Sequence, residues 1–256
     1  MAIQDLFSLQ GDVAIITGAG RGIGRAIAIA FAQAGASVVC AARTQADIDD
    51  TARQCRQSGG SALAVACDVS NEEDLAKLVK ACIDEFGKIS ILVNNAGGAY
   101  PNDPLKTDAK TFNRDFNFNV TCALSLTQLC QPQLLANKGN VINITSAVAR
   151  YAQAGFSSYG TAKAALTQLT KLLAADFAPN IRVNGVAPGT ILTEALGQFL
   201  NEEIQGKMTA LTPLKSLGRP DDIAAAALYL ASPAARWVSG KIIEVDGGAE
   251  STTWPF

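Results

Sequence analysis

The sequence predicts an α/β fold of three layers, in which helices cover both faces of a central parallel sheet of about seven strands. Two observations predict it. Short apolar runs alternate with longer amphipathic stretches along the 256 residues. The runs are apolar on both faces, which is typical of strands buried between two helical layers. Because crossovers between parallel strands are right-handed, this alternation indicates a doubly wound Rossmann fold.

The same alternation fixes where each element is expected. Strands are predicted over residues 13–17, 37–42, 62–67, 89–94, 140–145, 182–186 and 241–245. Helices are predicted over residues 23–34, 47–58, 72–86, 108–135, 157–178 and 221–230. Some helix ends carry their own signals, since Gly35 can stop the first helix, Ser70 can cap the third and Pro220 can open the last.

One segment departs from the alternation. Residues 188–217 hold short helical pieces instead of one strand or one helix. A long insertion at this place is expected to act as a lid on the substrate side. We expect residues 1–256 to form a single domain that includes this segment, without internal repeats or low-complexity linkers.

Composition narrows the classes of function. Apolar residues make up 48% of the chain and charged residues 17%, and the net charge is −2, which argues against a disordered chain and against a nucleic-acid partner. No apolar run approaches the ~20 residues of a membrane span, and the first residues do not resemble a signal peptide. We therefore expect a cytoplasmic protein with no membrane partner.

The cysteines and the absence of histidine limit the chemistry further. The six cysteines form no Cys-x-x-Cys pair, so we expect free, mostly buried thiols in a reducing cytoplasm. The chain contains no histidine. This removes Ser-His and Cys-His nucleophiles and nearly all common zinc sites, and no metal site is predicted. The catalytic base must therefore be another residue type.

A glycine-rich turn, TGAGRGIG over residues 17–24, joins the first predicted strand to the first predicted helix. Glycines allow a sharp turn and a close approach to a pyrophosphate, and a helix N-terminus offers free N–H groups and a positive dipole. The place of the turn favours a dinucleotide site over a plain tight turn. The candidate contacts are Gly18, Gly20, Arg21, Gly22, Ile23 and Gly24.

The end of the second predicted strand indicates which dinucleotide is bound. An NAD site places a carboxylate in this region to hold the ribose 2′-hydroxyl. Here Arg43 follows the strand, no carboxylate comes before Asp47, and Arg21 lies in the turn. Two guanidinium groups would bind a 2′-phosphate through charge-assisted hydrogen bonds. We therefore expect NADP(H); the alternative is that both arginines are simply solvated.

Three polar side chains form a candidate catalytic set. Tyr159 and Lys163 are four residues apart, so they share one face of a predicted helix. The lysine charge is expected to lower the pKa of the phenol, which suits it to give a proton to a carbonyl oxygen and to reclaim it in reverse. Ser146 follows the fifth predicted strand and can polarise the same oxygen. Such a pair alone is usually helix surface, but together with the serine and the nucleotide turn it indicates hydride transfer between a nicotinamide and a carbonyl.

These motifs together resemble the short-chain dehydrogenase/reductase superfamily over nearly the whole chain. The turn is similar to the family's T-G-x-x-x-G-x-G motif, residues 94–97 match its N-N-A-G element and residues 245–248 match its closing strand. The resemblance implies a fourth catalytic residue, Asn119, which holds a water and completes a proton path through Lys163. It also implies cofactor contacts at Asp68, Val69, Asn95, Ala96, Gly97, Tyr159, Lys163, Pro188, Gly189, Ile191 and Thr193.

Within the superfamily, residues 189–196, 203–208 and 232–240 are similar to bacterial 7α-hydroxysteroid dehydrogenases, although Arg43 departs from the acidic residue of the NAD-using members. The resemblance implies an NADP(H)-dependent oxidoreductase that interconverts a secondary alcohol and a ketone of a small-molecule substrate, with a hydroxysteroid as the first candidate. The alternatives are a 3-oxoacyl carrier-protein reductase, an enzyme of small cyclic or aryl ketones or polyols, and a non-catalytic nucleotide-binding subunit. A carrier-protein partner would need a basic docking patch, for which the candidates are Arg150, Lys207, Lys215 and Arg219.

The last expectations concern the residues that form the pocket walls and the oligomeric state of the protein. Candidate pocket walls are Phe116, Phe118, Tyr151, Phe156, Phe199 and Met208. The resemblance implies a homotetramer with the helices at 108–135 and 157–178 in one interface, which the apolar stripe of the second helix permits. The C-terminal tail, residues 250–256, is a candidate for packing at a subunit border.

Overall fold

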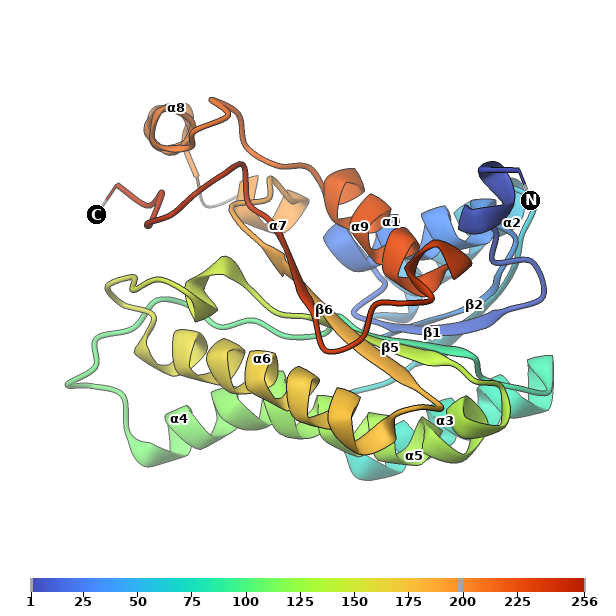
Figure 1. Ribbon diagram of the computed structural model, residues 1–256. Coiled ribbons are helices and arrows are strands. Elements are labelled where there is room, and N and C mark those ends of the chain that lie inside the picture. Colours follow the sequence, from blue (N-terminus) through green and yellow to red (C-terminus); the bar gives the residue numbers. More distant parts are fainter. Residues whose placement is uncertain (1, 198–199, 256) are drawn as a thin grey trace.

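One parallel sheet runs through the centre of the molecule (Figure 1). The computed structural model describes residues 2–197 and 200–255, and within these ranges seven strands pair in the order β3-β2-β1-β4-β5-β6-β7. Every pair is parallel. The strands are β1 (Val13–Thr17), β2 (Ser37–Ala42), β3 (Ser61–Ala66), β4 (Ile91–Asn94), β5 (Asn140–Ile144), β6 (Arg182–Pro188) and β7 (Ile242–Val245). The predicted Rossmann fold is confirmed.

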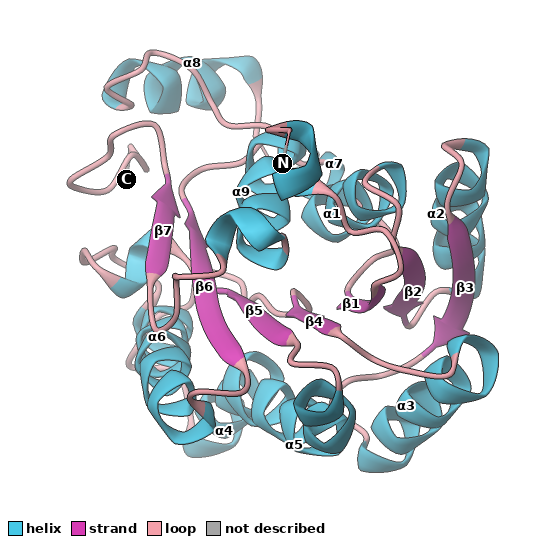
Figure 2. Cartoon of the chain, turned by 45° about the vertical axis from the view of Figure 1, so that its right-hand side comes forward, coloured by secondary structure: helices cyan, strands magenta, loops and turns pink. Residues whose placement is uncertain are grey.

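Helices form a layer on each face of the sheet (Figure 2). They are α1 (Gly22–Gln33), α2 (Gln45–Gln57), α3 (Glu72–Phe86), α4 (Ala109–Phe116), α5 (Cys122–Ala136), α6 (Ser157–Phe177), α7 (Glu194–Gly197), α8 (Glu202–Leu211) and α9 (Pro220–Ala231). One buried cluster joins α1, α2 and α9 to one face of the sheet, and a second joins α3, α5 and α6 to the other face. In the described ranges, no helix is both long enough and apolar enough to cross a membrane.

The strands are apolar on both faces because both faces are buried. In β1, Ile16 belongs to the cluster under α1, whereas Ile15 belongs to the cluster on the opposite face, and both are 0% exposed. Successive side chains of a strand point to opposite faces, so a strand such as β1 contributes side chains to both clusters. Burial of such a side chain contributes about 1.5–3 kcal/mol, which explains why the central strands are continuous apolar runs.

The order of the strands reverses at β1, which has β2 on one side and β4 on the other. In open α/β sheets, this arrangement leaves a crevice outside the carboxyl ends of the strands. The glycine-rich turn follows β1, Asn95 follows β4 and Ser146 lies just beyond β5. The sheet therefore brings predicted site residues from three places in the sequence to one edge.

The long helix predicted over residues 108–135 is interrupted. α4 ends at Phe116 and α5 begins at Cys122, with a π-helical segment, Asn117–Thr121, between them. The N–H of Cys122 donates to the carbonyl oxygen of Asn117, five residues back. Such turns are frequent at functional sites, and this one carries Asn119.

The helix-end signals are partly confirmed. Gly35 follows α1 with a φ of +100°, and Pro220 opens α9, as predicted. Ser70 does not cap α3; Asn71 does, because its side-chain oxygen accepts hydrogen bonds from the N–H groups two and three residues further on. Neighbouring serine and asparagine residues are both good caps, so the local pattern does not separate them.

All six cysteines are free and buried, as predicted. Burial raises the pKa of the Cys67 and Cys82 thiols to about 12. These thiols therefore stay protonated at neutral pH and behave as small apolar side chains.

Candidate active site

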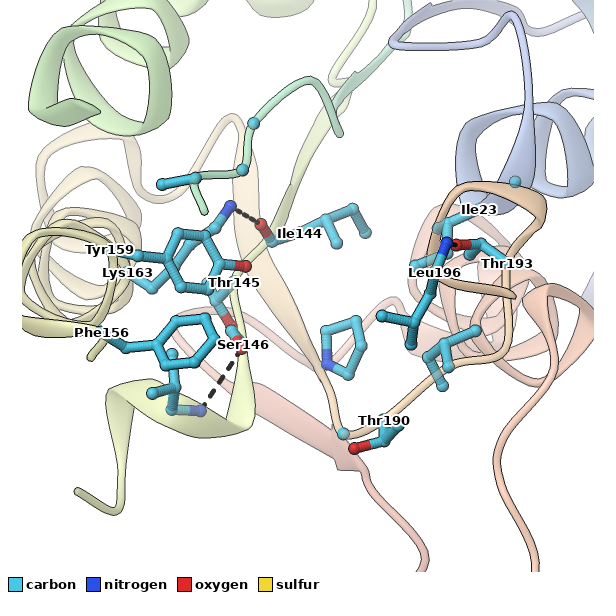
Figure 3. A pocket seen from close by; sticks show the side chains of 18 of the residues that line it. Ile23, Ile144, Thr145, Ser146, Phe156, Tyr159, Lys163, Thr190, Thr193 and Leu196 are labelled. Carbon is cyan, nitrogen blue, oxygen red and sulfur yellow. Dashed lines mark hydrogen bonds between the residues drawn. The ribbon is translucent and has the colours of Figure 1, made fainter. Parts of the chain in front are cut away.

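A cavity of about 680 Å³ opens at the carboxyl edge of the sheet. It is lined by the glycine-rich turn, the loop after β4, the region from the end of β5 to the start of α6, the segment after β6, and the C-terminal tail. Figure 3 shows Tyr159 on one side of the cavity, and Thr193 and Leu196 on the other.

The cavity brings together most of the predicted site residues. Those that line it are Gly18, Arg21, Gly22, Ile23, Gly24, Asn95, Ala96, Gly97, Ser146, Tyr159, Lys163, Pro188, Gly189, Ile191 and Thr193. The predicted residues outside its lining are Gly20, Arg43, Asp68, Val69 and Asn119. Arg43 directly follows β2, and Asp68 and Val69 lie just beyond β3, so these three share the carboxyl edge of the sheet with the cavity.

The glycine-rich turn is packed too tightly to accept side chains. A Cβ on Gly24 would lie 2.2 Å from the carbonyl oxygen of Gly18, and a Cβ on Gly18 itself would lie 2.8 Å from Nδ2 of Asn95. That amide donates to the carbonyl oxygen of Thr17 at 2.8 Å. The hydroxyl of Thr17 accepts hydrogen bonds from the N–H groups of Asn95 and Ala96, both at 3.0 Å. The N-N-A-G element therefore holds the turn in place.

The start of α1 has the properties of a pyrophosphate site. α1 begins at Gly22, and Arg21 before it makes no side-chain cap hydrogen bond. The first N–H groups of a helix lack partners within the helix, and that end of the dipole is positive. A Cβ on Gly22, whose φ is +56°, would lie 3.2 Å from Cγ2 of Thr193 and would fill the cradle. The residues at this end of the cavity therefore fit a dinucleotide.

Arg25 supports the turn from α1, and sequence reasoning did not single it out. Its Nη2 donates to the carbonyl oxygen of Gly20 at 2.6 Å, and its Nε donates to Oγ1 of Thr51 at 3.2 Å. Its Nη1 lies 3.7 Å from the carboxylate of Glu194, at the start of α7. One guanidinium thus links the turn to α2 and to the segment predicted as a lid. These partners are far apart in the sequence, so no local pattern could reveal the role.

Tyr159 lies in the first turn of α6 and lines the cavity together with Ser146. Burial raises the pKa of the Tyr159 phenol, and the nearby Ser146 hydroxyl opposes that rise. The expectation that the neighbouring lysine lowers the phenol pKa is therefore wrong for the groups that the chain itself supplies, because desolvation dominates. The phenol holds its proton at neutral pH.

Lys163 is only 3% exposed. Its Nζ donates to the carbonyl oxygen of Ile144 at 2.9 Å and lies 5.7 Å from the centre of the Tyr159 ring (Figure 3). Burial lowers the pKa of Lys163 to about 8. A lysine that titrates near neutral pH beside a half-buried phenol in a cavity is typical of a functional site.

Asn119 lies behind the cavity wall, in the π-helical segment. Its Nδ2 donates to the carbonyl oxygens of Gly98 at 3.1 Å and Asp115 at 2.8 Å, and its Oδ1 accepts from the N–H of Gly98 at 2.8 Å. A Cβ on Gly97 would lie 2.7 Å from Oδ1 of Asn119 and 3.0 Å from Nζ of Lys163. The two side chains therefore approach each other across Gly97, although only the lysine lines the cavity.

The walls beyond Tyr159 are largely apolar. Tyr151 and Phe156 line the cavity, as predicted. Phe116 and Phe118 pack against core clusters, Met208 is fully buried outside the lining, and Phe199 lies outside the described residues.

Other wall residues were not predicted individually. They come from the loop after β4, from the short 3-10 helix Ala147–Ala149, from the segment 188–217 and from the tail, and include Tyr100, Pro101, Val148, Thr190, Leu196, Leu200, Ile204 and Trp254. The segment 188–217 is expected to cover the substrate side. Eight of its residues, all between 188 and 204, line the cavity, and residues 198 and 199 lie outside the described residues.

Known proteins are similar to this chain in sequence and in fold. Residues 18–250 match the family model described as enoyl-(acyl carrier protein) reductase. The chain is 50% identical over 249 residues to an uncharacterized oxidoreductase of Mycobacterium tuberculosis, covering 96% of this chain and 95% of the relative. It is 46% identical over 247 residues to the 7α-hydroxysteroid dehydrogenase of Escherichia coli K12, covering 96% of each.

A solved structure agrees with these sequence matches. It is a 7α-hydroxysteroid dehydrogenase complexed with NADH and 7-oxo glycochenodeoxycholic acid, and it is similar to this chain with a TM-score of 0.93 and 45% identity, covering 97% of this chain and 98% of the other. The family model and the relatives span nearly the whole chain, and the motifs meet at one cavity. The chain therefore belongs to the short-chain dehydrogenase/reductase family of oxidoreductases.

Proposed function

We propose that this family member is an NADP(H)-dependent oxidoreductase that interconverts a secondary alcohol and a ketone, with a hydroxysteroid as its substrate. One observation carries the proposal. The phenol of Tyr159 and the hydroxyl of Ser146 both lie in the wall of a cavity that the glycine-rich turn also lines (Figure 3). A proton donor, a polarising hydroxyl and a pyrophosphate cradle are thus present in one cavity.

The two hydroxyl groups would hold the substrate oxygen between them. Ser146 donates a hydrogen bond to that oxygen and stabilises the negative charge that develops on it. Tyr159 gives up its proton to the same oxygen. The raised pKa of the phenol keeps that proton in place at neutral pH, which favours carbonyl reduction, and alkaline pH favours the reverse reaction. A bound nicotinamide would supply the hydride.

Lys163 would return a proton to the Tyr159 phenolate and would regain that proton from solvent, through a water that Asn119 would help to hold. Lys163 lies on the same helix as the tyrosine, and Asn119 approaches the lysine across Gly97. The lowered pKa of Lys163 makes loss and recovery of a proton feasible near pH 8. The π-helical segment supports this role because it places the Asn119 amide against the loop that lines the cavity.

The preference for NADP(H) rests on two exposed arginines. Arg21 lies in the turn, Arg43 directly follows β2, and no carboxylate intervenes before Asp47. Asp47 is nevertheless close to the turn, since its Oδ2 lies 3.7 Å from a Cβ built on Gly20. The comparison of kcat/KM for NADPH and NADH with one ketone is therefore the direct test. We expect NADPH to be preferred at least about tenfold; a preference for NADH would remove this part of the proposal and leave the reaction type standing.

A bulky apolar substrate is supported by the walls of the cavity. Tyr151, Phe156 and Leu200 lie on the substrate side, and the related solved structure holds a 7-oxo bile acid.

A 3-oxoacyl group on a carrier protein is less supported as the substrate. Arg150 is already paired with three carboxylates, and Lys207 with one on its own helix, so two of the four candidates for a basic docking patch are neutralised.

For assembly we propose a single domain that forms a homotetramer in the cytoplasm. Leu172 on α6 is 53% exposed and Leu129 on α5 is 40% exposed, so both predicted interface helices carry apolar surface that a subunit could cover. Leu166 and Leu173 are buried in the chain's own core, which leaves only part of the predicted stripe for an interface. Light scattering that gives the mass of one subunit would refute the tetramer.

A spectrophotometric screen tests the reaction. NADPH oxidation would be followed with a 7-oxo bile acid, an acetoacetyl thioester, and small cyclic and aryl ketones. We expect the 7-oxo bile acid to give the highest kcat/KM. A protein that binds NADPH but turns over none of these ketones would instead support a non-catalytic nucleotide-binding subunit.

A further inference from the structure

The C-terminal segment, residues 249–254, brings Trp254 into the wall of the cavity. Figures 1 and 2 show the C-terminus on the same side of the molecule as α8. Trp254 lines the cavity, and its ring centre is 5.5 Å from that of Phe156. The Phe156 ring is in turn 6.0 Å from the Tyr159 ring. Three aromatic rings thus lead from the proposed proton donor to the C-terminal segment.

Arg150 holds the beginning of the segment. Its Nη1 lies 2.5 Å from the carboxylate of Glu250, and its Nη2 donates to the carbonyl oxygen of Ala249. The same guanidinium is 2.8 Å from Asp246 and 3.2 Å from Glu244. Because Arg150 follows the short helix after Ser146, it ties the C-terminal segment to the catalytic wall of the cavity.

The end of the segment is fixed to the segment 188–217. The hydroxyls of Thr253 and Thr190 are hydrogen-bonded at 2.9 Å, and Thr253 is only 3% exposed. The N–H of Trp254 donates to Oγ1 of Thr252 at 3.1 Å. The indole is therefore carried by a backbone that is anchored at both ends to elements lining the cavity.

We propose that Trp254 is a specificity-determining residue that packs against the ring system of a polycyclic ketone, and that Arg150 positions it through the segment 249–254. The inference rests on the proposed function, because it takes the carbonyl to sit at Tyr159. An indole offers a large, rigid contact face at a low cost in conformational entropy. The ring contacts run from Tyr159 to Phe156 and from Phe156 to Trp254, so we expect a fused ring system held at Tyr159 to use the indole more than a single-ring ketone does.

The first test compares two substrates with three variants. Trp254→Ala should lower kcat/KM for a 7-oxo bile acid about tenfold, mainly by raising KM, with cyclohexanone changed less than twofold and NADPH affinity unchanged. Trp254→Phe should restore most of the loss. Trp237→Ala is the matched control, because the chain's other tryptophan is 91% exposed and lies outside the cavity lining.

Arg150→Met tests the positioning role. It should raise KM for the bile acid as Trp254→Ala does while leaving kcat within about twofold, and the double variant should lose little more than either single one because both act on one contact. Additive losses, or an equal loss on both ketones, would show that Arg150 serves the fold instead.

A binding experiment decides the inference without turnover. In a Trp237→Phe protein, Trp254 is the only tryptophan, so its emission reports on the cavity directly. Titration of the 7-oxo bile acid in the presence of NADP⁺ should change that emission saturably, and cyclohexanone should not. If no ketone is reduced at all, the proposed function fails, yet a saturable change would still support Trp254 as the wall. No change with the bile acid, or equal kinetic losses on both substrates, overturns the inference.

Discussion

Nζ of Lys163 lies 5.7 Å from the centre of the Tyr159 ring, while its hydrogen bond goes to the carbonyl oxygen of Ile144 at 2.9 Å. In this structure the lysine thus contacts the tyrosine ring and is hydrogen-bonded to the backbone. Burial raises the pKa of the phenol and lowers the pKa of the ammonium to about 8, so each group resists its charged form. The charge needed for catalysis must come from what binds in the cavity.

Removal of the phenol hydroxyl should stop the reaction without damaging the site. Tyr159→Phe keeps the ring that packs against Phe156 and removes the proposed proton donor. We expect kcat to fall by about 10³-fold, within the range typical of a lost general acid, and NADPH affinity to stay within about twofold. Steady-state rates and a fluorescence titration of NADPH measure the two effects. Turnover within tenfold of the unmodified enzyme would remove Tyr159 from this role.

The buried lysine should make stability depend on pH in a predictable direction. The pKa of Lys163 is about 8 in the folded chain and 10.5 as the ordinary value. Between these values the unfolded chain binds a proton that the folded chain does not, so the free energy of unfolding rises with pH in this window. At neutral pH the burial costs about 3 kcal/mol, and this cost is relieved as pH rises through the window.

Urea unfolding of the unmodified protein and of Lys163→Met at pH 7.5 and 9.5 measures this effect. Relative to the variant, the unmodified protein should gain about 2 kcal/mol between the two pH values, because other groups titrate alike in both. Parallel pH profiles for the two proteins would mean that the lysine is not desolvated as described.

The sequence was sufficient to predict the layers of the fold and most of the cavity. A short run of apolar residues indicates a strand that is buried on both faces. In β1, Ile15 and Ile16 are buried on opposite faces of the sheet, as such a run predicts. Once the strands are parallel, residues that follow their carboxyl ends meet at one edge, which predicts that the glycine-rich turn and Ser146 lie together, whereas Asn95 was predicted from the family resemblance.

What could not be predicted depends on contacts between distant segments. The π-helical segment is stabilised where Asn119 bonds to the backbone of Gly98, and no pattern within residues 108–135 marks it. The pKa shift of Tyr159 was predicted with the wrong sign, because the lysine charge is visible in the sequence and the extent of burial is not. The place of Trp254 in the cavity wall could not be predicted either, because the contacts that hold its segment, from Arg150 to Glu250 and from Thr190 to Thr253, join segments far apart in the sequence.

A methyl group in the glycine-rich turn should disrupt the cofactor site. A Cβ on Gly24 would lie 2.2 Å from the carbonyl oxygen of Gly18. Because this oxygen belongs to the backbone, rotation of a side chain cannot relieve the clash. We expect Gly24→Ala to cost at least about 2 kcal/mol of stability and to weaken NADPH binding more than tenfold. Thermal unfolding and a binding titration measure these effects.

Gly206→Ala is the matched control for that variant. Gly206 is an exposed glycine within α8 with no atom within 4 Å of a built Cβ. The same change there should stabilise the protein by about 0.5–1 kcal/mol, because alanine loses less backbone entropy in a helix. Similar effects of the two substitutions would contradict the tight packing of the turn.

Reversal of the charge after β2 should change the cofactor preference. Arg43→Asp removes a proposed partner of the 2′-phosphate and places a carboxylate where it can hold a free 2′-hydroxyl and repel a phosphate. The ratio of kcat/KM for NADPH to that for NADH should fall by about 100-fold, or about 2.7 kcal/mol in transition-state free energy. Arg236→Asp, at an exposed arginine outside the cavity lining, makes the same change in net charge and should leave the ratio unaltered. If Arg43→Asp also leaves the ratio unaltered, the side chain of Arg43 is simply solvated and the discrimination must come from Arg21 in the turn.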